Sequence, residues 1–215
     1  MKKLIKNTTL GLAGAGLLLA ASQAMAQPFT ITFTDTYGPA KTDWSHNFVL
    51  QKFNPAWGSL QAVYITATNT VNIDGTVQNT STGPQSFTFK AGSTITVTLP
   101  GLLGSLQASP LATAQAFNLP AGVTAPYGPI SASADANYTY TLPADMASFI
   151  GTGTMSLPGI TQSTEIITGG GGNIVASLNT LSGATVWVTY TYIPEPGSLA
   201  LLALGGVVML LRKRR

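Results

Sequence analysis

One histidine is the starting point for any search for chemistry in these 215 residues, namely His46, which follows Asp43 and Ser45 closely. A serine, a histidine and an aspartate can together generate a nucleophile when the histidine removes the serine proton. On a strand, however, neighbouring side chains face opposite sides. The spacing therefore predicts no nucleophilic triad, and we interpret His46 as a surface or strand-edge histidine.

The acidic residues between Gln27 and Ile193 are scattered, and no spacing proposes the carboxylate pair of a glycoside hydrolase. Asp35 and Asp43 flank an expected turn at Gly38-Pro39, where calcium is an alternative to solvated turn acids. With no cysteine and one histidine, the sequence does not favour a zinc site. We expect no metal, no cofactor and no catalytic residue, so the interpretation is a protein that is not an enzyme; a hydrolase stays the least favoured alternative.

Three tryptophans offer flat faces that suit the C–H surfaces of sugar rings. Trp187 lies within an apolar alternation and is expected in the core. Trp57 sits in an expected turn, and Trp44 precedes a strand. These two are the candidate glycan contacts, and they favour the alternative of a secreted carbohydrate-binding or adhesive module if they are exposed on one face.

The C-terminal residues form a motif in three parts. Pro194-Glu195-Pro196 comes first, the apolar run 199–211 second, and the basic cluster Arg212, Lys213, Arg214 and Arg215 last. As a helix the run spans roughly 20 Å, against about 30 Å of bilayer hydrocarbon. Because proline on both sides of Glu195 prevents regular structure there, the motif is held extended and accessible. We expect a short transmembrane helix with its cations on the cytoplasmic side.

These three parts, in this order, resemble the PEP-CTERM sorting signal. The resemblance implies processing by an exosortase near Pro194-Glu195-Pro196, in a Gram-negative bacterium that secretes exopolysaccharide. The alternative is an ordinary single-pass C-terminal anchor, for which the apolar run is short. The expected sorting signal covers 194–215.

The N-terminal residues are typical of a secretory signal peptide. Three lysines precede an apolar stretch from Leu10 to Ala21, and Ala24 and Ala26 form a small-residue cleavage site. An uncleaved membrane helix is the alternative. We expect a signal helix over residues 1–26 that is removed by signal peptidase after passage through the export machinery.

Most of the positive charge lies in these two terminal segments. The whole chain has a formal charge of +3, but seven of its ten lysines and arginines are in residues 1–26 and 212–215. The remaining body keeps three lysines and six acids, a charge of −3. A charge-poor, mildly acidic body excludes nucleic acid as a partner.

The body is predicted to be all-β. Threonine alternates with apolar residues in several segments, which indicates strands with one buried face and one hydroxyl face. Asp74-Gly75 predicts a two-residue hairpin. The 27–193 body is expected to be one antiparallel β-sandwich, jelly-roll-like, of eight to ten strands, because one-sided sheets must bury their faces on each other. The expected strands include 29–34, 47–50, 62–68, 86–89, 93–99, 138–142 and 184–192.

Two segments of the body do not follow the strand pattern. Residues 100–129 contain five prolines, and we expect a short helix over 111–117 or a flap along one edge of the sandwich. Gly169 to Gly172 lack the lysine and hydroxyl residues of a phosphate-binding loop. They are interpreted as a hinge or wide turn.

The segment from Leu50 to Val63 resembles the choice-of-anchor E domain, whose members carry an F-D-P-x-x-G-x-L-x-x-V signature. Asn54 stands where that family has aspartate, which keeps a turn-forming side chain and removes a charge. Family members are exported bacterial proteins with alternative C-terminal anchors. The matching residues are interpreted as fold-determining: Phe53 ends a strand, Asn54-Pro55 starts a turn, Gly58 adopts a positive φ, and Leu60 and Val63 enter the next strand.

These expectations combine into a function. The chain is expected to be a non-enzymatic exported protein that halts in the inner membrane, meets an exosortase, and reaches the cell surface or an extracellular matrix. Exopolysaccharide is a candidate partner there. The leading interpretation is therefore a structural or interaction protein of the cell envelope or exopolysaccharide matrix.

Overall fold

The structure is a computed structural model that describes residues 27–101 and 104–195. Its strands form a compact unit from Thr30 to Tyr192. The only helical segments of the described residues are one turn of α-helix, α2, and three 3-10 turns, η1 to η3. The elements in chain order are β1 (Phe29–Lys41), β2 (Ser45–Gln51), η1 (Pro55–Trp57), β3 (Ser59–Asn79), β4 (Gln85–Thr98), β5 (Ser105–Ala108), β6 (Gln115–Leu119), β7 (Thr124–Tyr140), α2 (Pro143–Met146), η2 (Ala147–Phe149), β8 (Thr154–Gly169), η3 (Gly170–Gly172) and β9 (Ile174–Ile193).

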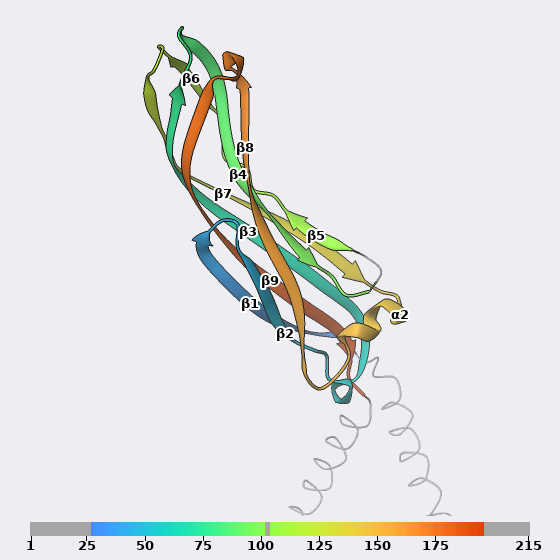
Figure 1. Cartoon of the computed structure of the whole chain (residues 1–215). Helices are drawn as coiled ribbons and strands as arrows, with labels where there is room; N and C mark the ends of the chain where they lie inside the picture. Colours follow the sequence, from blue (N-terminus) through green and yellow to red (C-terminus); the bar gives the residue numbers. More distant parts are fainter. Residues whose placement is uncertain (1–26, 102–103, 196–215) are drawn as a thin grey trace, which may run out of the picture. The chain divides into compact units, whose positions relative to one another are not determined.

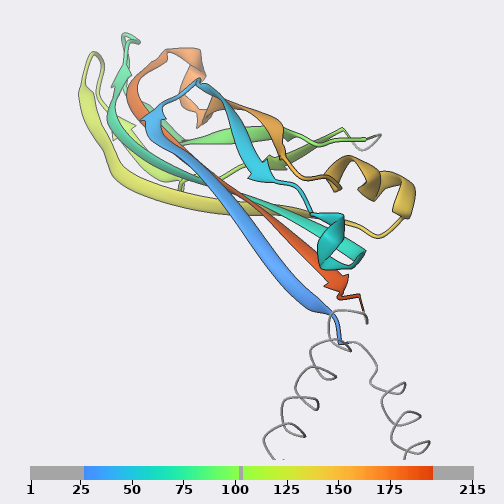
Figure 2. The ribbon, with the colours of Figure 1, turned by 90° about the horizontal axis from the view of Figure 1, so that it is seen from below.

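The strands form two antiparallel sheets. One sheet has the order β1-β9-β3-β7, and the other has the order β2-β8-β4-β5, with β6 pairing with β4 (Figure 1). Viewed from below, β1 and β9, in blue and red-orange, run side by side in one layer (Figure 2). The prediction of an all-β antiparallel sandwich is confirmed, and the nine strands of the described residues fall within the expected number.

Alternation along β9 shows how threonine-rich segments build this fold. Ala184, Val186, Val188 and Tyr190 are buried, while the residues between them are half-buried on the other side of the sheet. Trp187 is one of those intervening residues. The expectation that Trp187 belongs to the core is therefore wrong, because a period of two places it opposite the buried set.

The hairpin expected at Asp74-Gly75 is absent, because both residues lie inside the 21-residue strand β3. The pairing of β3 with β7 shifts register between Ile73 and Gly75, as at a β-bulge. A Cβ atom on Gly75 would lie 2.2 Å from the carbonyl oxygen of Ser177 on β9. The glycine therefore marks a close approach between strands rather than a chain reversal.

Two more expected breaks lie within strands. Gly38-Pro39 belongs to β1 and is not a turn. The glycine allows a close approach of the neighbouring strand, since a Cβ atom on Gly38 would lie 2.6 Å from the Ser182 carbonyl oxygen. Segments 86–89 and 93–98 are one strand, β4, which continues through Gly92. Here too the glycine admits a neighbour, the carbonyl oxygen of Pro110, 2.2 Å from the position of a Cβ atom.

The segment from Pro100 to Pro129 contains two short strands, β5 and β6, and the start of β7. The helix expected over 111–117 is wrong, since β6 begins at Gln115 and pairs with β4. A helical turn is found instead at α2 and η2. The turn expected at Gly169 to Gly172 is confirmed, and all four glycines have positive φ.

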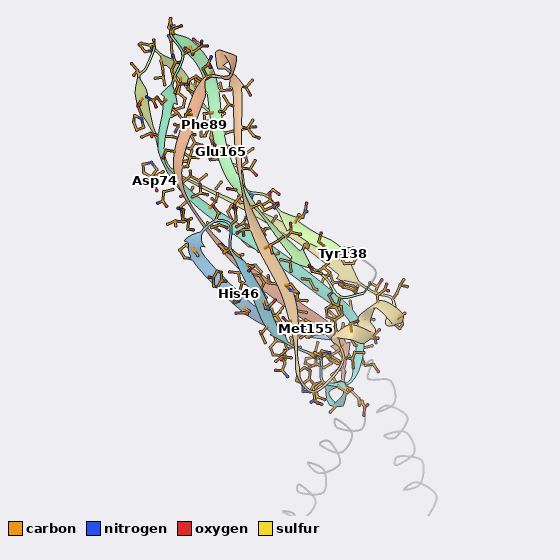
Figure 3. All side chains as sticks on the ribbon, in the orientation of Figure 1. His46, Asp74, Phe89, Tyr138, Met155 and Glu165 are labelled. Atoms are coloured by element: carbon orange, nitrogen blue, oxygen red, sulfur yellow. The ribbon has the colours of Figure 1, made fainter. Side chains whose placement is uncertain are left out.

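The sandwich contains two hydrophobic cores along its length. The larger core includes Trp44, Phe48, Phe53, Phe149 and Tyr190. The smaller core consists of Val71, Ile73, Val77, Phe87, Phe89, Ala91, Ala112, Leu119 and Tyr127. In Figure 3, Met155 of the larger core and Phe89 of the smaller core lie in different halves of the unit.

A buried polar layer, formed by Asn69, Ser93 and Ser182, lies at the boundary between the two cores. The Asn69 amide donates to the Ser93 hydroxyl at 3.0 Å and to the carbonyl oxygen of Ala108 at 3.3 Å. The Ser182 hydroxyl donates to Asn69 Oδ1 at 2.7 Å. Because β3 and β9 belong to one sheet and β4 and β5 to the other, this layer links the two sheets through hydrogen bonds.

Candidate functional site

His46 lies on the edge strand β2 and packs among aromatic rings. Its imidazole stacks on Tyr37 with the ring centres 4.4 Å apart, and the Phe48 ring meets it edge-on at 5.0 Å. Nε2 is 3.7 Å from the nearer carboxylate oxygen of Asp35, too far for a hydrogen bond, and it is buried without a hydrogen-bond partner among the described residues. The strand-edge position is confirmed.

The residues that precede His46 serve the backbone instead of forming a triad. Asp43 Oδ1 accepts a hydrogen bond from the backbone N–H of Ser163 at 2.6 Å. Ser45 is exposed, and among the described residues no hydroxyl group hydrogen-bonds to the His46 ring. This arrangement has no nucleophile for the histidine to activate.

The carboxylates of Asp35 and Asp43, the candidate calcium ligands, accept hydrogen bonds from neutral backbone groups. The two oxygens of Asp35 accept from the backbone N–H groups of Thr36 and Val49, at 2.8 and 2.7 Å. Within 27–101 and 104–195, no three histidine or acidic side chains gather as a metal-binding group. Figure 3 shows Asp74 and Glu165 in the half of the unit away from His46.

The two candidate glycan contacts lie in different environments. Trp44 is only 8% exposed, and its indole N–H donates to the carbonyl oxygen of Ser182 at 3.0 Å. A glycan-contact role for Trp44 is wrong, because burial leaves no free ring face. Trp57 is half-buried at the end of η1 and stacks on Phe33 at 6.2 Å, so its role in glycan contact stays a prediction.

The turn before β3 agrees with the prediction except at its start, because β2 ends at Gln51 and Phe53 forms an isolated bridge with Ile150. Phe53 is buried, Asn54 Oδ1 accepts from the Ala56 backbone N–H at 3.0 Å, and Gly58 has φ 141°. Leu60 and Val63 lie in β3. These residues shape a turn and contribute no reactive group, in agreement with a role in the fold.

The expected sorting motif begins directly after β9. Pro194 and Glu195 are outside any strand, and Glu195 is exposed. Residues 193–215 match the PEP-CTERM protein-sorting motif. This motif implies exosortase-dependent sorting and processing of an exported protein that passes through the membrane. The match covers about a tenth of the chain and leaves the β-sandwich unassigned.

Several residues expected to act in export and sorting lie outside the described residues. They are Ala24 and Ala26 of the signal peptide, Pro196, the apolar run 199–211 and the basic cluster from Arg212 to Arg215. Within the described part of the chain, no helix is both long and apolar enough to cross a membrane.

Comparison with curated proteins gave no match. Matching solved structures include one of infectious bursal disease virus strain Gx, 16% identical over 81% of this chain and 42% of the viral chain, with a TM-score of 0.13. The xylanase 10B CBM22-1–GH10 modules of Clostridium thermocellum are 9% identical over 78% of this chain and 26% of theirs, with a TM-score of 0.13. This chain thus spans less than half of each, and scores this low carry no argument about fold or function.

One feature of the sheets that bears on binding is not among the sequence predictions. Threonine alternation predicts a solvated hydroxyl face, and the apolar residues around Trp187 predict a core position for it. With Trp187 on the outer side of β9, this hydroxyl-bearing face also carries an aromatic ring. The signal was present in the sequence, because Trp187 shares its alternation phase with Thr185 and Thr189.

Proposed function

We propose that the chain is a non-enzymatic structural or interaction protein of the bacterial cell envelope or exopolysaccharide matrix. In this proposal a signal peptide directs export and is removed after Ala26. The C-terminal segment then halts the chain in the inner membrane, and an exosortase processes it near Pro194-Glu195-Pro196. The observation that carries the proposal is the sorting-motif match at 193–215, immediately after the last strand of the sandwich.

The body is proposed to be a choice-of-anchor E-like domain. Support comes from the turn between β2 and β3, where Phe53 is buried, Asn54 caps η1 and Gly58 has a positive φ, as expected of residues that determine the fold. A non-enzymatic role is supported by the environment of His46 and by the engagement of Asp35 and Asp43 with backbone groups. A hydrolase would need carboxylates gathered in a cleft.

Sorting through the motif can be tested by changing Glu195 to alanine. In a host that carries an exosortase, the unaltered chain should be recovered without its basic cluster, as intact-mass measurement would show. The Glu195→Ala chain should stay in the membrane fraction at full C-terminal length, because the acidic residue between two prolines is the proposed recognition element.

Glu165→Ala is the matched control, since Glu165 is an exposed glutamate on β8 and lies outside the motif. That variant should be processed like the unaltered chain. Equal processing of the Glu195→Ala chain would contradict recognition through Glu195. Mature protein that keeps Arg212 to Arg215 would contradict processing altogether and indicate a membrane-tethered domain.

A further inference from the structure

The outer face of the β1-β9-β3-β7 sheet presents hydroxyl groups in cross-strand pairs. The Thr32 and Thr189 hydroxyl oxygens are 2.8 Å apart, and the Thr36 hydroxyl donates to Thr185 at 3.0 Å. We call this surface the hydroxyl face. Its other members, on β3 and β7, include Thr68, Thr70, Asn72, Ser131, Ser133 and Asp135.

A depression of about 220 Å³ opens in the hydroxyl face where β9 and β1 lack side chains. Gly183 and Gly38 meet there, since a Cβ atom on Gly38 would lie 2.8 Å from the Gly183 Cα atom. Thr36, Thr70 and Thr185 are among the residues that line it. The volume is below the ~300–1,000 Å³ of sites that enclose a small molecule. It therefore suits one residue of a chain that continues across the face.

The rim of the depression keeps hydrogen-bonding capacity for a ligand. Thr185 accepts from Thr36, so its own hydroxyl hydrogen is available. Asn72 accepts from Ser131 through Oδ1, and its amide N–H groups donate to no group in the described part of the chain. Neutral donors and acceptors of this kind match the hydroxyl groups of a sugar.

Trp187 adds an aromatic surface beside the depression. It lies between Thr185 and Thr189 on the outer side of β9, and its indole N–H donates to no group among the described residues. That nitrogen is not buried. A ring with one apolar face and a free donor can stack on a sugar ring and bond to its hydroxyls.

The charge of this face favours an uncharged ligand. Asp74 and Asp135 are the acids that β3 and β7 carry, and both accept hydrogen bonds from neutral side chains, Asn179 and Thr68. β3, β7 and β9 carry no lysine or arginine, and β1 carries one, Lys41, which is exposed at the end of the strand. An anionic polysaccharide would find this single cation on the sheet and would meet a body of charge −3.

We infer that the hydroxyl face binds a neutral polysaccharide, with one sugar residue in the depression over Gly183 and a later residue of the same chain stacked on Trp187, roughly 13 Å further along β9. This inference deepens the proposed function, and rests on it only for the origin of the polysaccharide. It places a glycan contact on the outer side of β9, apart from the one predicted at Trp57 in η1.

The test uses the full chain, purified in detergent, and measures its depletion by cellulose, cross-linked dextran and calcium alginate beads. Retention on at least one of the neutral glucans is expected, with little change between about 0.1 and 1 M salt because no ion pairs are involved. Weak retention is expected on alginate, the anionic probe. No retention on either neutral glucan, or stronger retention on alginate, would overturn the inference.

Three variants locate the site. Trp187→Ala removes the stacking surface and should weaken retention about tenfold, a loss of about 1.4 kcal/mol. Gly183→Val fills the depression, and its Cβ atom would lie 3.3 Å from the Pro39 nitrogen, which asks for a small adjustment. Thr70→Val keeps the side-chain shape and removes one hydroxyl group, so this variant should stay folded. It can therefore test the site even if the other two variants are unstable.

Thr96→Val is the matched control, because Thr96 is a half-buried threonine on β4 of the other sheet. It should bind as the unaltered chain does. Unchanged retention in the Thr70→Val and Gly183→Val chains would overturn the placement of the site. Glu195→Ala chains should bind normally, so a failure of sorting and a failure of binding give different results.

Discussion

The two hydrophobic cores differ in how they are closed. The larger core is covered at its end by α2 and η2, which add Met146 and Phe149 to residues from both sheets. The smaller core meets only η3 at its end, whose three glycines add no side chain, and it draws Phe87 and Phe89 from β4 against Tyr127 of β7. The end of the sandwich with the smaller core therefore depends more heavily on strand pairing and on the connections between strands.

At the end with the smaller core, the side chain of Asn79 stabilises the connections between strands through hydrogen bonds. Its amide donates to the carbonyl oxygens of Gly83, Leu119 and Pro120, at 2.9, 2.9 and 3.1 Å. Its side-chain oxygen accepts from Ser81. One buried asparagine thus secures the connections around the smaller core, where the larger core uses apolar side chains from a helical turn. The difference indicates that polar bonds replace apolar cover when the available segment is short.

The largest expected effect comes from truncating one phenylalanine in each core. Phe48 and Phe89 are both fully buried, and Phe→Ala in a core costs about 3–5 kcal/mol of unfolding free energy. Phe48→Ala should lie at the upper end of this range, because its neighbours are fixed from several sides and cannot fill the cavity. Phe89→Ala should lie at the lower end, because the smaller core can relax. Urea unfolding of the two variants measures the difference.

Hydrogen exchange provides the control for that comparison. In the Phe89→Ala chain, amide protection should fall first in β6 and the adjoining part of β4, and persist in β2. Equal costs, with uniform loss of protection in both variants, would show that the two cores respond as one.

A smaller effect is expected from the polar layer between the cores. Asn69→Ala removes the partner of Ser182 and of Ser93 and should cost about 1–3 kcal/mol, because buried polar groups lose their hydrogen bonds. Replacing all three together, as Asn69→Leu, Ser93→Ala and Ser182→Ala, should recover more than half of that loss. Thermal unfolding of the single and triple variants measures both values.

The triple variant also tests what the layer does for the fold. A triple variant less stable than Asn69→Ala alone would contradict the view that the cost of Asn69→Ala comes from buried polar groups left without partners. A suitable reference is Asn79→Ala, since Asn79 is an equally buried asparagine on the same strand and lies at the end of the sandwich.

The strands of the larger core were the easier part to predict from sequence. Segments 62–68 and 184–192 alternate over most of their length, and both are parts of longer strands, β3 and β9. The alternation of apolar and polar residues along a strand is interrupted where another strand packs closely against its backbone. At Gly38, Gly75 and Gly92 a neighbouring carbonyl approaches within the space of a Cβ atom. Sequence alone assigns such glycines to turns, because close approach between distant strands leaves no local signal.

The candidate sites divide in a similar way. The sorting motif could be predicted because its prolines, apolar run and basic cluster follow one another in one contiguous segment. The hydroxyl face could not, since Thr36 and Thr185 come together only through strand pairing. Trp44 was misassigned for a related reason: its burial depends on Ser182, which is 138 residues away in the chain.

The smallest expected effect concerns how the stability of the two cores depends on pH, through their buried tyrosines. Burial raises the pKa of Tyr140, in the larger core, from 10.0 to about 12, and the nearby Tyr138 and Asp145 add to the rise. Burial also raises the pKa of Tyr190 in that core and of Tyr127 in the smaller core. Between pH 10 and 12 the folded Tyr140 keeps a proton that the unfolded chain has lost. Its contribution to stability is therefore fully present below pH 10 and is lost as the pH rises toward 12.

Tyr140→Phe should consequently destabilise the chain more at neutral pH than at alkaline pH. At pH 7 the variant loses the hydrogen bond from the Tyr140 hydroxyl to the Pro100 carbonyl oxygen, which costs about 1 kcal/mol. Above pH 10 it should lose stability less steeply than the unaltered chain, so the two unfolding curves approach each other. Tyr64→Phe, which changes an exposed ring on β3, is the control and should leave the alkaline loss in place. Parallel curves for Tyr140→Phe and the unaltered chain up to pH 12 would show that this phenol does not set the alkaline limit, and would leave Tyr190 and Tyr127 to account for any loss.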